Sequence, residues 1–155
     1  CGMRVIAVDP RRSDKPAEVS ELWRPERLDD LLAQSDFVVL CAPHTPETEG
    51  MIGEAQIARM KPTATLVNVG RGALIDEEAL ACALREGRLG MAGLDVYRWE
   101  PLPDASPLRT LPNVVLSPHL GGGSSRSWDV DIPAALENIR RFFRGEAPTG
   151  LVAGG

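Results

Sequence analysis

The stretch LVNVGRGALIDEEAL, from Leu66 to Leu80, joins an apolar segment to an amphipathic one through the tripeptide Gly-Arg-Gly. Gly70 and Gly72 remove side-chain bulk on both sides of Arg71, so backbone and guanidinium can approach a ligand closely. A strand, a glycine-bounded loop and a helix in direct succession are typical of the repeating unit of an α/β fold. We therefore expect Arg71 to face a ligand rather than merely to lead a helix into solvent.

Strand and helix signals alternate along the rest of the chain. Apolar segments predict strands at residues 3–9, 37–41, 65–69, 91–96 and 113–118. Amphipathic segments predict helices that begin at Pro25, at residue 53 and after Asp76, with Gly87 closing the third. Because each crossover between parallel strands returns over the sheet, this alternation predicts a doubly wound parallel sheet covered on both faces.

A last helical periodicity runs from about Ser124 to Arg144. Its apolar residues recur near helical spacing, and Pro133 is expected to kink the helix. Gly145 is expected to end it. The tail that follows has no strong pattern.

Composition excludes several classes of protein. The net charge of −5, with scattered arginines, gives no basic patch for nucleic acid or an anionic membrane surface. The longest apolar run, which starts at Phe37, is shorter than the ~18 residues of a membrane span. The residues that follow Cys1 show no signal-peptide pattern. We expect a soluble, cytoplasmic protein that binds a small molecule or a protein partner.

The three cysteines, Cys1, Cys41 and Cys82, have no metal-ligand spacing and cannot all pair with one another. We interpret them as free buried thiols in a reducing compartment, and we expect no metal site.

Polar or special residues follow each predicted strand: Asp9, Pro43 with His44, Arg71, Asp95 and His119. The carboxyl ends of parallel strands meet at one edge of a sheet, where ligands bind. A carboxylate at Asp9 suits the adenosine ribose of NAD and repels the 2′-phosphate of NADP. Arg11 and Arg12 weaken this preference, and a plain strand-end acid is an equal alternative.

The glycine-rich G-x-G-x-x-G loop that accompanies such an acid belongs about 20 residues upstream. Only eight residues precede Asp9. Either the fold does not bind a dinucleotide, or the chain begins inside a dinucleotide-binding domain.

The segments VIAVDP, CAPHTPETEGMI, NVGRGALIDEEAL, GLDVYRWEPLP and SPHLGGG, in this order, resemble consecutive motifs of the D-isomer-specific 2-hydroxyacid dehydrogenases, the family that includes phosphoglycerate dehydrogenase. The resemblance runs from about Gly2 to Val152. It implies a Rossmann-like, doubly wound parallel sheet that is incomplete, without its first strand and glycine loop. Residues 1–123 would form a partial NAD-binding domain, and residues 124–155 a crossover helix and tail leading back to a substrate domain.

The resemblance also implies a catalytic set of Arg71, Glu100 and His119. Arg71 would bind the substrate carboxylate, and His119 would exchange a proton with the 2-oxo or 2-hydroxy oxygen. Glu100 would hydrogen-bond the imidazole and fix its orientation. Taken singly, a lone histidine is usually structural and a lone glutamate is usually solvated.

The implied cofactor is NAD, with Asp95 beside the nicotinamide. The other residues implied to line the cofactor are Asp9, Ala42, Pro43, Thr48, Val69, Gly70, Arg71, His119 and Gly121. His44 is interpreted as a loop residue near the cofactor. Turn formation is the alternative for Pro43 and Gly121, and capping is the alternative for Thr48.

These residues predict an oxidoreductase that transfers hydride between NAD(H) and a small 2-hydroxy or 2-oxo acid. Glu100 argues against the formate dehydrogenases of this superfamily, which carry glutamine there. An NAD(H)-sensing, corepressor-like binding module and an inactive truncated fragment are the alternatives. The resemblance further implies a homodimer for the full-length protein.

Overall fold

The computed structural model describes residues 2–123 and 125–150. The chain divides into two compact units between His119 and Leu120, and each unit is described by itself. Cys1, Ser124 and residues 151–155, which some of the predictions include, lie outside the described residues. The domain boundary predicted between residues 123 and 124 stays a prediction.

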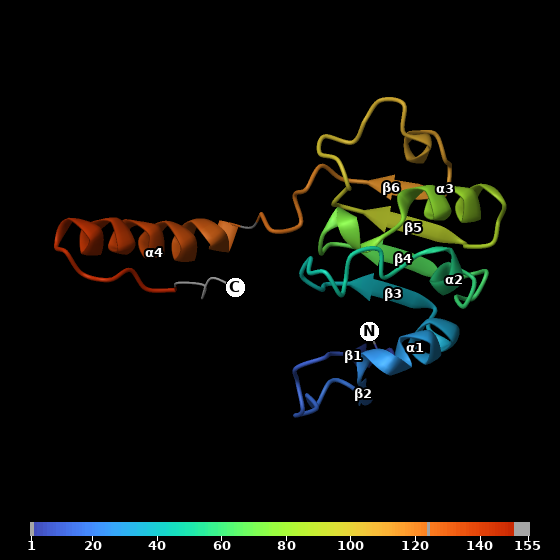
Figure 1. Ribbon diagram of the computed structural model, residues 1–155, viewed down its shortest axis with the longest axis horizontal. Coiled ribbons are helices and arrows are strands. Elements are labelled where there is room, and N and C mark those ends of the chain that lie inside the picture. Colours follow the sequence, from blue (N-terminus) through green and yellow to red (C-terminus); the bar gives the residue numbers. More distant parts are fainter. Residues whose placement is uncertain (1, 124, 151–155) are drawn as a thin grey trace. The chain divides into compact units, whose positions relative to one another are not determined.

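The first unit contains two parallel sheets (Figure 1). In the smaller sheet, β1 (Ile6–Val8) pairs with β2 (Glu21–Trp23). The larger sheet pairs four strands in chain order: β3 (Phe37–Leu40), β4 (Thr65–Asn68), β5 (Met91–Leu94) and β6 (Val114–Leu116). The register sets the last residues of these four strands side by side, so the segments that follow them start at one sheet edge.

Helices connect the strands of the larger sheet. The 3-10 turn η1 (Pro25–Arg27) leads into α1 (Leu28–Gln34), and α2 (Glu54–Ile57) and α3 (Glu77–Arg85) follow β3 and β4. Two further 3-10 turns are η2 (Gly72–Leu74) and η3 (Pro107–Arg109).

The ends of α3 follow the sequence rules for helix caps. The Asp76 carboxylate accepts the N–H groups of Glu78 and Ala79, both at 3.1 Å, which satisfies donors that the first helical turn leaves unpaired. Gly87 has φ +68°, the left-handed conformation that commonly closes a helix. The predicted boundaries of this helix are confirmed.

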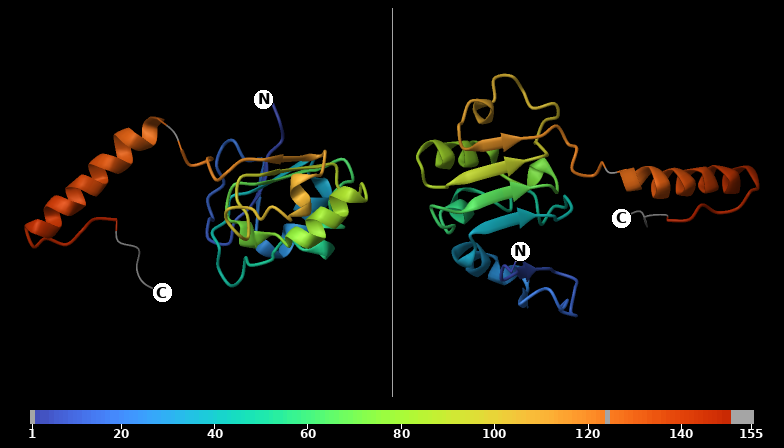
Figure 2. Two further views of the ribbon diagram at one scale, coloured as in Figure 1. Left: turned by 90° about the horizontal axis from the view of Figure 1, so that it is seen from above. Right: turned by 180° about the vertical axis from the view of Figure 1, so that it is seen from behind.

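The helices cover one face of the larger sheet (Figure 2, left). Alternate strand residues such as Val38 and Leu66 are buried with Leu32 and Leu80 of the helices in one continuous core. The intervening residues face the other way and are 45% to 62% exposed: Phe37, Val39, Met91 and Val115. Within the first unit, the described helices therefore lie on one face of the larger sheet, and a strand pattern alone does not show what covers the other face.

Three further details differ from the predictions. The strand β2 was missed, because three residues after a polar loop carry no recognisable apolar run. The strand expected at residues 3–9 is confined to Ile6–Val8. Cys41 is exposed and Cys82 is half-buried, rather than both buried, and both thiols are free. Cys41 is exposed because it continues the outward alternation of Phe37 and Val39.

Within the part of the chain that the structure describes, the smaller and the larger sheet are not joined by strand pairing. Among the described residues, β1 pairs only with β2, and β3 pairs only with β4. Each of these strands consequently has one edge without a strand partner, which leaves backbone groups available for pairing.

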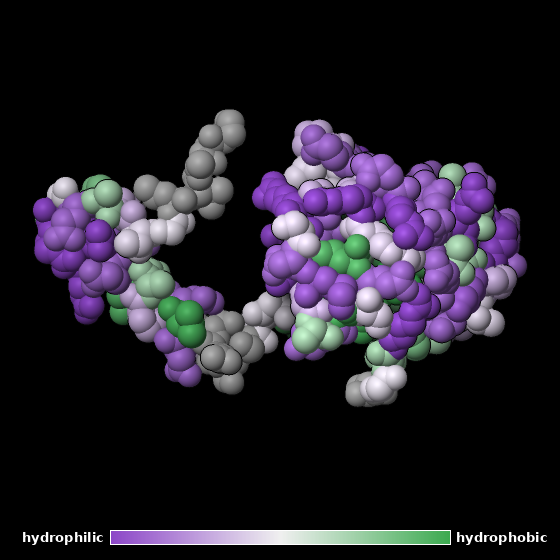
Figure 3. Space-filling model, turned by 90° about the horizontal axis from the view of Figure 1, so that it is seen from below, coloured by the Kyte–Doolittle hydropathy of each residue, from purple (hydrophilic) through white to green (hydrophobic). Residues whose placement is uncertain are grey.

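The second unit is built around α4 (Ser125–Phe143). This helix runs through Pro133 without interruption, the kink expected there stays a prediction, and Gly145 follows the helix with φ +72°. Large apolar side chains remain exposed on both units (Figure 3). Among the described residues, none of the helices combines the length and apolar character that crossing a bilayer requires.

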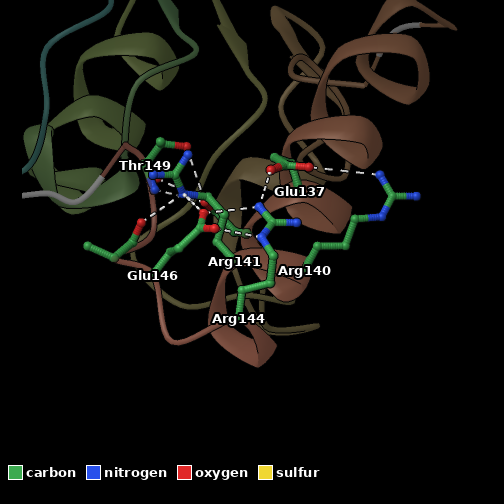
Figure 4. A network of polar contacts seen from close by, with 8 residues as sticks. Glu137, Arg140, Arg141, Arg144, Glu146 and Thr149 are labelled. Carbon is green, nitrogen blue, oxygen red and sulfur yellow. Dashed lines mark hydrogen bonds and ion pairs between the residues drawn. The ribbon is translucent and has the colours of Figure 1, made fainter.

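A network of charged side chains closes the C-terminal end of α4 (Figure 4). Arg144 bonds Glu137 at 3.0 Å and Glu146 at 2.7 Å, while Arg141 donates to the Ala147 carbonyl at 2.8 Å. These contacts fold the segment after Gly145 back along the helix. Since the partners are mostly exposed, each ion pair contributes little stability, roughly 0–1 kcal/mol.

Candidate active site

Glu100 and His119 form a hydrogen-bonded pair near the ends of β5 and β6. The Nδ1 atom of His119 lies 2.7 Å from Oε2 of Glu100. The other carboxylate oxygen accepts the Tyr97 N–H at 3.1 Å. The bond to His119, followed by the bond from Tyr97, lowers the pKa of Glu100 below its usual value.

The ionised carboxylate decides which nitrogen of His119 carries a proton. A carboxylate only accepts hydrogen bonds, so Nδ1 is the donor in this pair. The remaining nitrogen, Nε2, is the atom that can exchange a proton with a substrate. The pair thus has the arrangement of an oriented general acid and base.

The backbone of His119 is held in an unusual conformation. Its φ of +56° lies in the left-handed region, which costs a non-glycine residue roughly 1–3 kcal/mol. Its N–H donates to the Asp95 carbonyl at 2.8 Å, which ties His119 to the end of β5. Strain of this kind concentrates at functional sites, and it favours the catalytic interpretation of His119 over a structural one.

Asn68, the last residue of β4, builds the loop that carries Arg71. Its side chain is buried, donates to the Arg71 carbonyl at 2.9 Å and accepts the Gly70 N–H at 3.1 Å. We did not predict a role for Asn68 from the sequence. The only sign of its role in the sequence was a polar side chain at an inward position of an apolar strand. Such a side chain indicates a structural role because buried polar groups need hydrogen-bond partners.

The two glycines beside Arg71 make room for neighbouring loops. A Cβ atom at Gly72 would lie 1.8 Å from the carbonyl carbon of Tyr97, and one at Gly70 would lie 2.8 Å from the Ala42 oxygen. The sequence analysis assigned this space to a ligand. In the structure it is the backbone of adjacent segments that requires it.

Arg71 itself is exposed and lies close to the acid–base pair. Its guanidinium donates to the Gly70 carbonyl at 2.7 Å, and its charge is among the influences that lower the pKa of Glu100. The structure therefore pairs Glu100 with His119 directly, and it places the charge of Arg71 near enough to contribute, as the smallest influence, to the lowered pKa of Glu100.

Asp95 anchors the other side of the pair. Its buried carboxylate accepts a hydrogen bond from the Ser117 hydroxyl. We did not predict a role for Ser117 from the sequence. The Tyr97 hydroxyl lies 2.8 Å from the Ser117 carbonyl and 3.1 Å from the Leu94 carbonyl, and burial raises the pKa of Tyr97. These contacts bind the ends of β5 and β6 to each other.

A cavity of about 350 Å³ opens beside the pair. Glu100 and His119 form part of its wall together with Tyr97, and apolar side chains such as Leu102 and Leu116 complete much of the lining. The pair is therefore reachable by a small molecule and has a largely apolar surrounding on this side.

Several predicted cofactor residues have local structural partners. The Thr48 hydroxyl donates to the Pro43 carbonyl at 2.7 Å and accepts the Thr45 N–H at 2.8 Å, so it holds the loop after β3, and its part in cofactor binding stays a prediction. Val69, at the end of β4, is 45% exposed. Gly121 belongs to the second unit, so its predicted part in the site stays a prediction.

Asp9 stands at the end of β1, in the smaller sheet. Its Oδ1 accepts the N–H groups of Arg11 at 2.7 Å and Arg12 at 2.9 Å. The bonds from Arg12 and then Arg11 lower the pKa of Asp9. Because both bonds end on Oδ1, Oδ2 is left to accept from a ribose hydroxyl, and the residue fits both the turn-forming and the dinucleotide-binding interpretations.

Comparison with known families agrees with this arrangement. Residues 1–121 match the family model described as D-isomer specific 2-hydroxyacid dehydrogenase, NAD binding domain. The chain belongs to this family. The resemblance inferred from the sequence motifs is confirmed, as is the Rossmann-like α/β fold.

Individual relatives place the chain in the same group. It is 46% identical over 152 residues to a protein named glyoxylate reductase from Korarchaeum cryptofilum, covering 97% of this chain and 45% of that relative. A D-isomer specific 2-hydroxyacid dehydrogenase from Xanthobacter autotrophicus Py2 superposes with a TM-score of 0.86 at 38% identity, covering 97% of this chain and 49% of the other.

A second structure from Xanthobacter autotrophicus Py2, a D-isomer specific 2-hydroxyacid dehydrogenase in complex with NADPH and MES, superposes with a TM-score of 0.79 at 34% identity. The match covers 97% of this chain and 70% of that one. The chain spans about half the length of the curated relatives that it matches. The family match therefore concerns the NAD-binding domain, to which residues 1–121 correspond.

Proposed function

We propose that this chain supplies the cofactor domain and the acid–base pair of an oxidoreductase that transfers hydride between NAD(P)(H) and a small 2-hydroxy or 2-oxo acid. The observation that carries the proposal is the Glu100–His119 hydrogen bond of 2.7 Å, with the charge of Arg71 close enough to influence Glu100. A 2-oxo acid requires a cation that binds its carboxylate and an oriented imidazole that gives a proton to its carbonyl oxygen.

In this proposal Arg71 binds the substrate carboxylate through its guanidinium and so turns the 2-oxo group toward His119. The Nε2–H of His119 gives its proton to the 2-oxo oxygen during reduction, and neutral Nε2 takes the proton back during oxidation. Glu100 holds Nδ1–H and stabilises the imidazolium form. When bound, the nicotinamide cofactor supplies and receives the hydride.

The cofactor is proposed to be NAD in the first instance. The Asp9 carboxylate at the end of β1 favours an unsubstituted ribose, since it would repel a 2′-phosphate. Arg11 and Arg12 act in the opposite direction, and one structural relative was solved with NADPH. Both cofactors therefore belong in the assay.

The proposed substrates are small 2-oxo acids, with glyoxylate first because a relative at 46% identity is named glyoxylate reductase. The cytoplasmic location and the homodimer remain predictions from the sequence.

The test uses the full-length native protein with NADH or NADPH and a panel of 2-oxo acids. We expect oxidation of the cofactor with at least one acid, and we expect His119→Ala to lower kcat by about 10²–10⁴-fold, the usual contribution of a general acid. Binding of NADH, followed by its fluorescence, should be nearly unchanged in the variant. Absence of turnover with every acid and both cofactors would contradict the proposal.

A further inference from the structure

The segment of residues 97–100 carries Glu100 and is held from outside by Glu77. Oε1 of Glu77 accepts the backbone N–H of Arg98 at 2.6 Å, across 21 positions of the chain. Glu77 is the first residue of α3, which starts shortly after the loop that bears Arg71. This bond therefore joins the substrate-arginine side of the site to the acid–base side.

A second contact joins the same two parts of the chain. Gly72 lies so close to the segment that an added Cβ would be 1.8 Å from the Tyr97 carbonyl carbon and 2.3 Å from the Arg98 nitrogen. The bond of Glu77 and the packing of Gly72 thus fix the position of one peptide unit, the one between Tyr97 and Arg98.

That peptide unit is linked directly to the catalytic pair. The preceding N–H, of Tyr97, donates to Oε1 of Glu100 at 3.1 Å, and Oε2 of Glu100 meets His119 at 2.7 Å. A displacement of the 97–98 peptide would move the donor on Glu100 and, with it, the orientation of the imidazole. Positioning errors of this size matter, since misplacement by about 1 Å can cost about 10²-fold in rate.

Glu77 is not needed to cap its own helix. Asp76 already accepts the N–H groups of Glu78 and Ala79 at the start of α3. Glu78 has the same side chain and a place in the same first turn, yet it is exposed and makes no described side-chain hydrogen bond or ion pair. The two neighbouring glutamates therefore share their interaction with the helix dipole and differ in the contact to Arg98.

The Arg98 side chain adds a weaker link on the opposite side. Its guanidinium lies 3.2 Å from Oε1 of Glu49, whose other oxygen lies 3.5 Å from Nε2 of His44. These groups are about half exposed, and the Arg98–Glu49 contact of 3.2 Å is longer than the 2.6 Å bond of Glu77.

We propose that Glu77 is a positioning residue: its bond to the Arg98 N–H holds the Glu100–His119 pair in place relative to Arg71. This inference rests on the proposed dehydrogenase function. Glu77 touches neither substrate nor cofactor, and its effect passes through the 97–98 peptide unit.

The experiment compares Glu77→Ala, Glu77→Gln and the matched control Glu78→Ala in the full-length protein. Removal of the Glu77 carboxylate should lower kcat by about tenfold, as expected for a partly misplaced acid–base pair. NADH affinity should stay within about twofold, since Glu77 contributes only through the pair. Glu77→Gln keeps an acceptor oxygen and should restore most of the rate, and Glu78→Ala should match the unaltered protein.

A readout independent of turnover is the low-field proton resonance of the His119–Glu100 hydrogen bond. It should shift or broaden in Glu77→Ala and remain in place in Glu78→Ala. Equal rates and equal resonances in the two alanine variants would overturn the inference. Loss of turnover in the unaltered protein would instead contradict the proposed function, and the resonance comparison would still decide the role of Glu77.

Discussion

The two sheets of the first unit end in loops that differ in how they are held. After β4, β5 and β6, contacts cross from one loop to another: Glu77 accepts the Arg98 N–H, and Asp95 accepts from Ser117. At the end of β1, the described hydrogen bonds of the Asp9 side chain are those from the N–H groups of Arg11 and Arg12, two and three residues further along the same loop. Of the residues of β1 and β2, all of which the structure describes, only Trp23 is buried.

This difference separates the residues that we propose for catalysis from Asp9, the residue that we propose for the adenosine ribose. The acid–base pair and the substrate arginine are assembled by contacts within β3–β6 and the loops that follow them, whereas Asp9 stands on a small sheet with an unpaired edge. We therefore expect substitutions in the cross-linked loops to have large effects on both stability and rate, and substitutions at Asp9 to change cofactor choice with little effect on stability.

The largest effect is expected for Gly72→Ala. The added Cβ would lie 1.8 Å from the Tyr97 carbonyl carbon, so the two loops would have to separate. We expect the free energy of unfolding to fall by about 1–3 kcal/mol or more, as for other forced overpacking, and urea denaturation measures this. Gly93→Ala is the control, because its Cβ would meet only Val67 side-chain atoms at 3.8 Å and 4.0 Å. An equal loss in both variants would contradict the close packing of the loops.

Asn68→Ala should have the next largest effect. It leaves the Gly70 N–H and the Arg71 carbonyl without their side-chain partner in a buried place, which costs about 1–3 kcal/mol. Because Arg71 would lose its fixed position, KM for the 2-oxo acid should also rise. Thr65→Ala, at the half-buried start of the same strand, serves as the comparison, and it should leave KM unchanged.

The titration of Glu100 gives a smaller, pH-dependent effect. Its lowered pKa means that the ionised pair adds stability above the usual glutamate pKa of about 4.3, and that this contribution is lost as pH falls through the folded value. Carbon-13 NMR of the carboxyl group should show titration below that of an exposed glutamate. In His119→Ala the pKa of Glu100 should rise, because the strongest lowering contact is gone; an unchanged titration would contradict the pairing.

The smallest effect is expected for Asp9→Asn. The amide oxygen can still accept from Arg11 and Arg12, so the melting temperature should hardly change. Removal of the negative charge should shift the ratio of NADH to NADPH affinity toward NADPH by roughly tenfold, since the acid disfavours the 2′-phosphate. Isothermal titration with both cofactors measures this ratio. A ratio that stays the same would mean that Asp9 only forms the turn.

The sequence was sufficient where a feature depends on local pattern. Alternating apolar strands and capped helices predicted the order of the main elements, and Asp76 and Gly87 predicted the ends of α3. The strand-end positions of Arg71 and His119 predicted that both would reach one sheet edge, because parallel strands share a direction.

Features that depend on contacts between distant segments could not be read in this way. Ser117 and Glu77 gain their roles only when separate loops meet, and a single polar residue has no periodicity that would reveal such a meeting. The strand β2 was missed for a related reason, since strand pairing is a property of the assembled fold.

The most direct test of the central claim is a single-turnover measurement of hydride transfer, in which the full-length protein, saturated with NADH, is mixed with glyoxylate or the best acid of the panel. The account predicts rapid loss of NADH absorbance in the unaltered protein and transfer slowed by about 10²–10⁴-fold in His119→Ala, with NADH binding retained. Equal transfer rates in the two proteins would show that His119 is not the proton donor and would contradict the account.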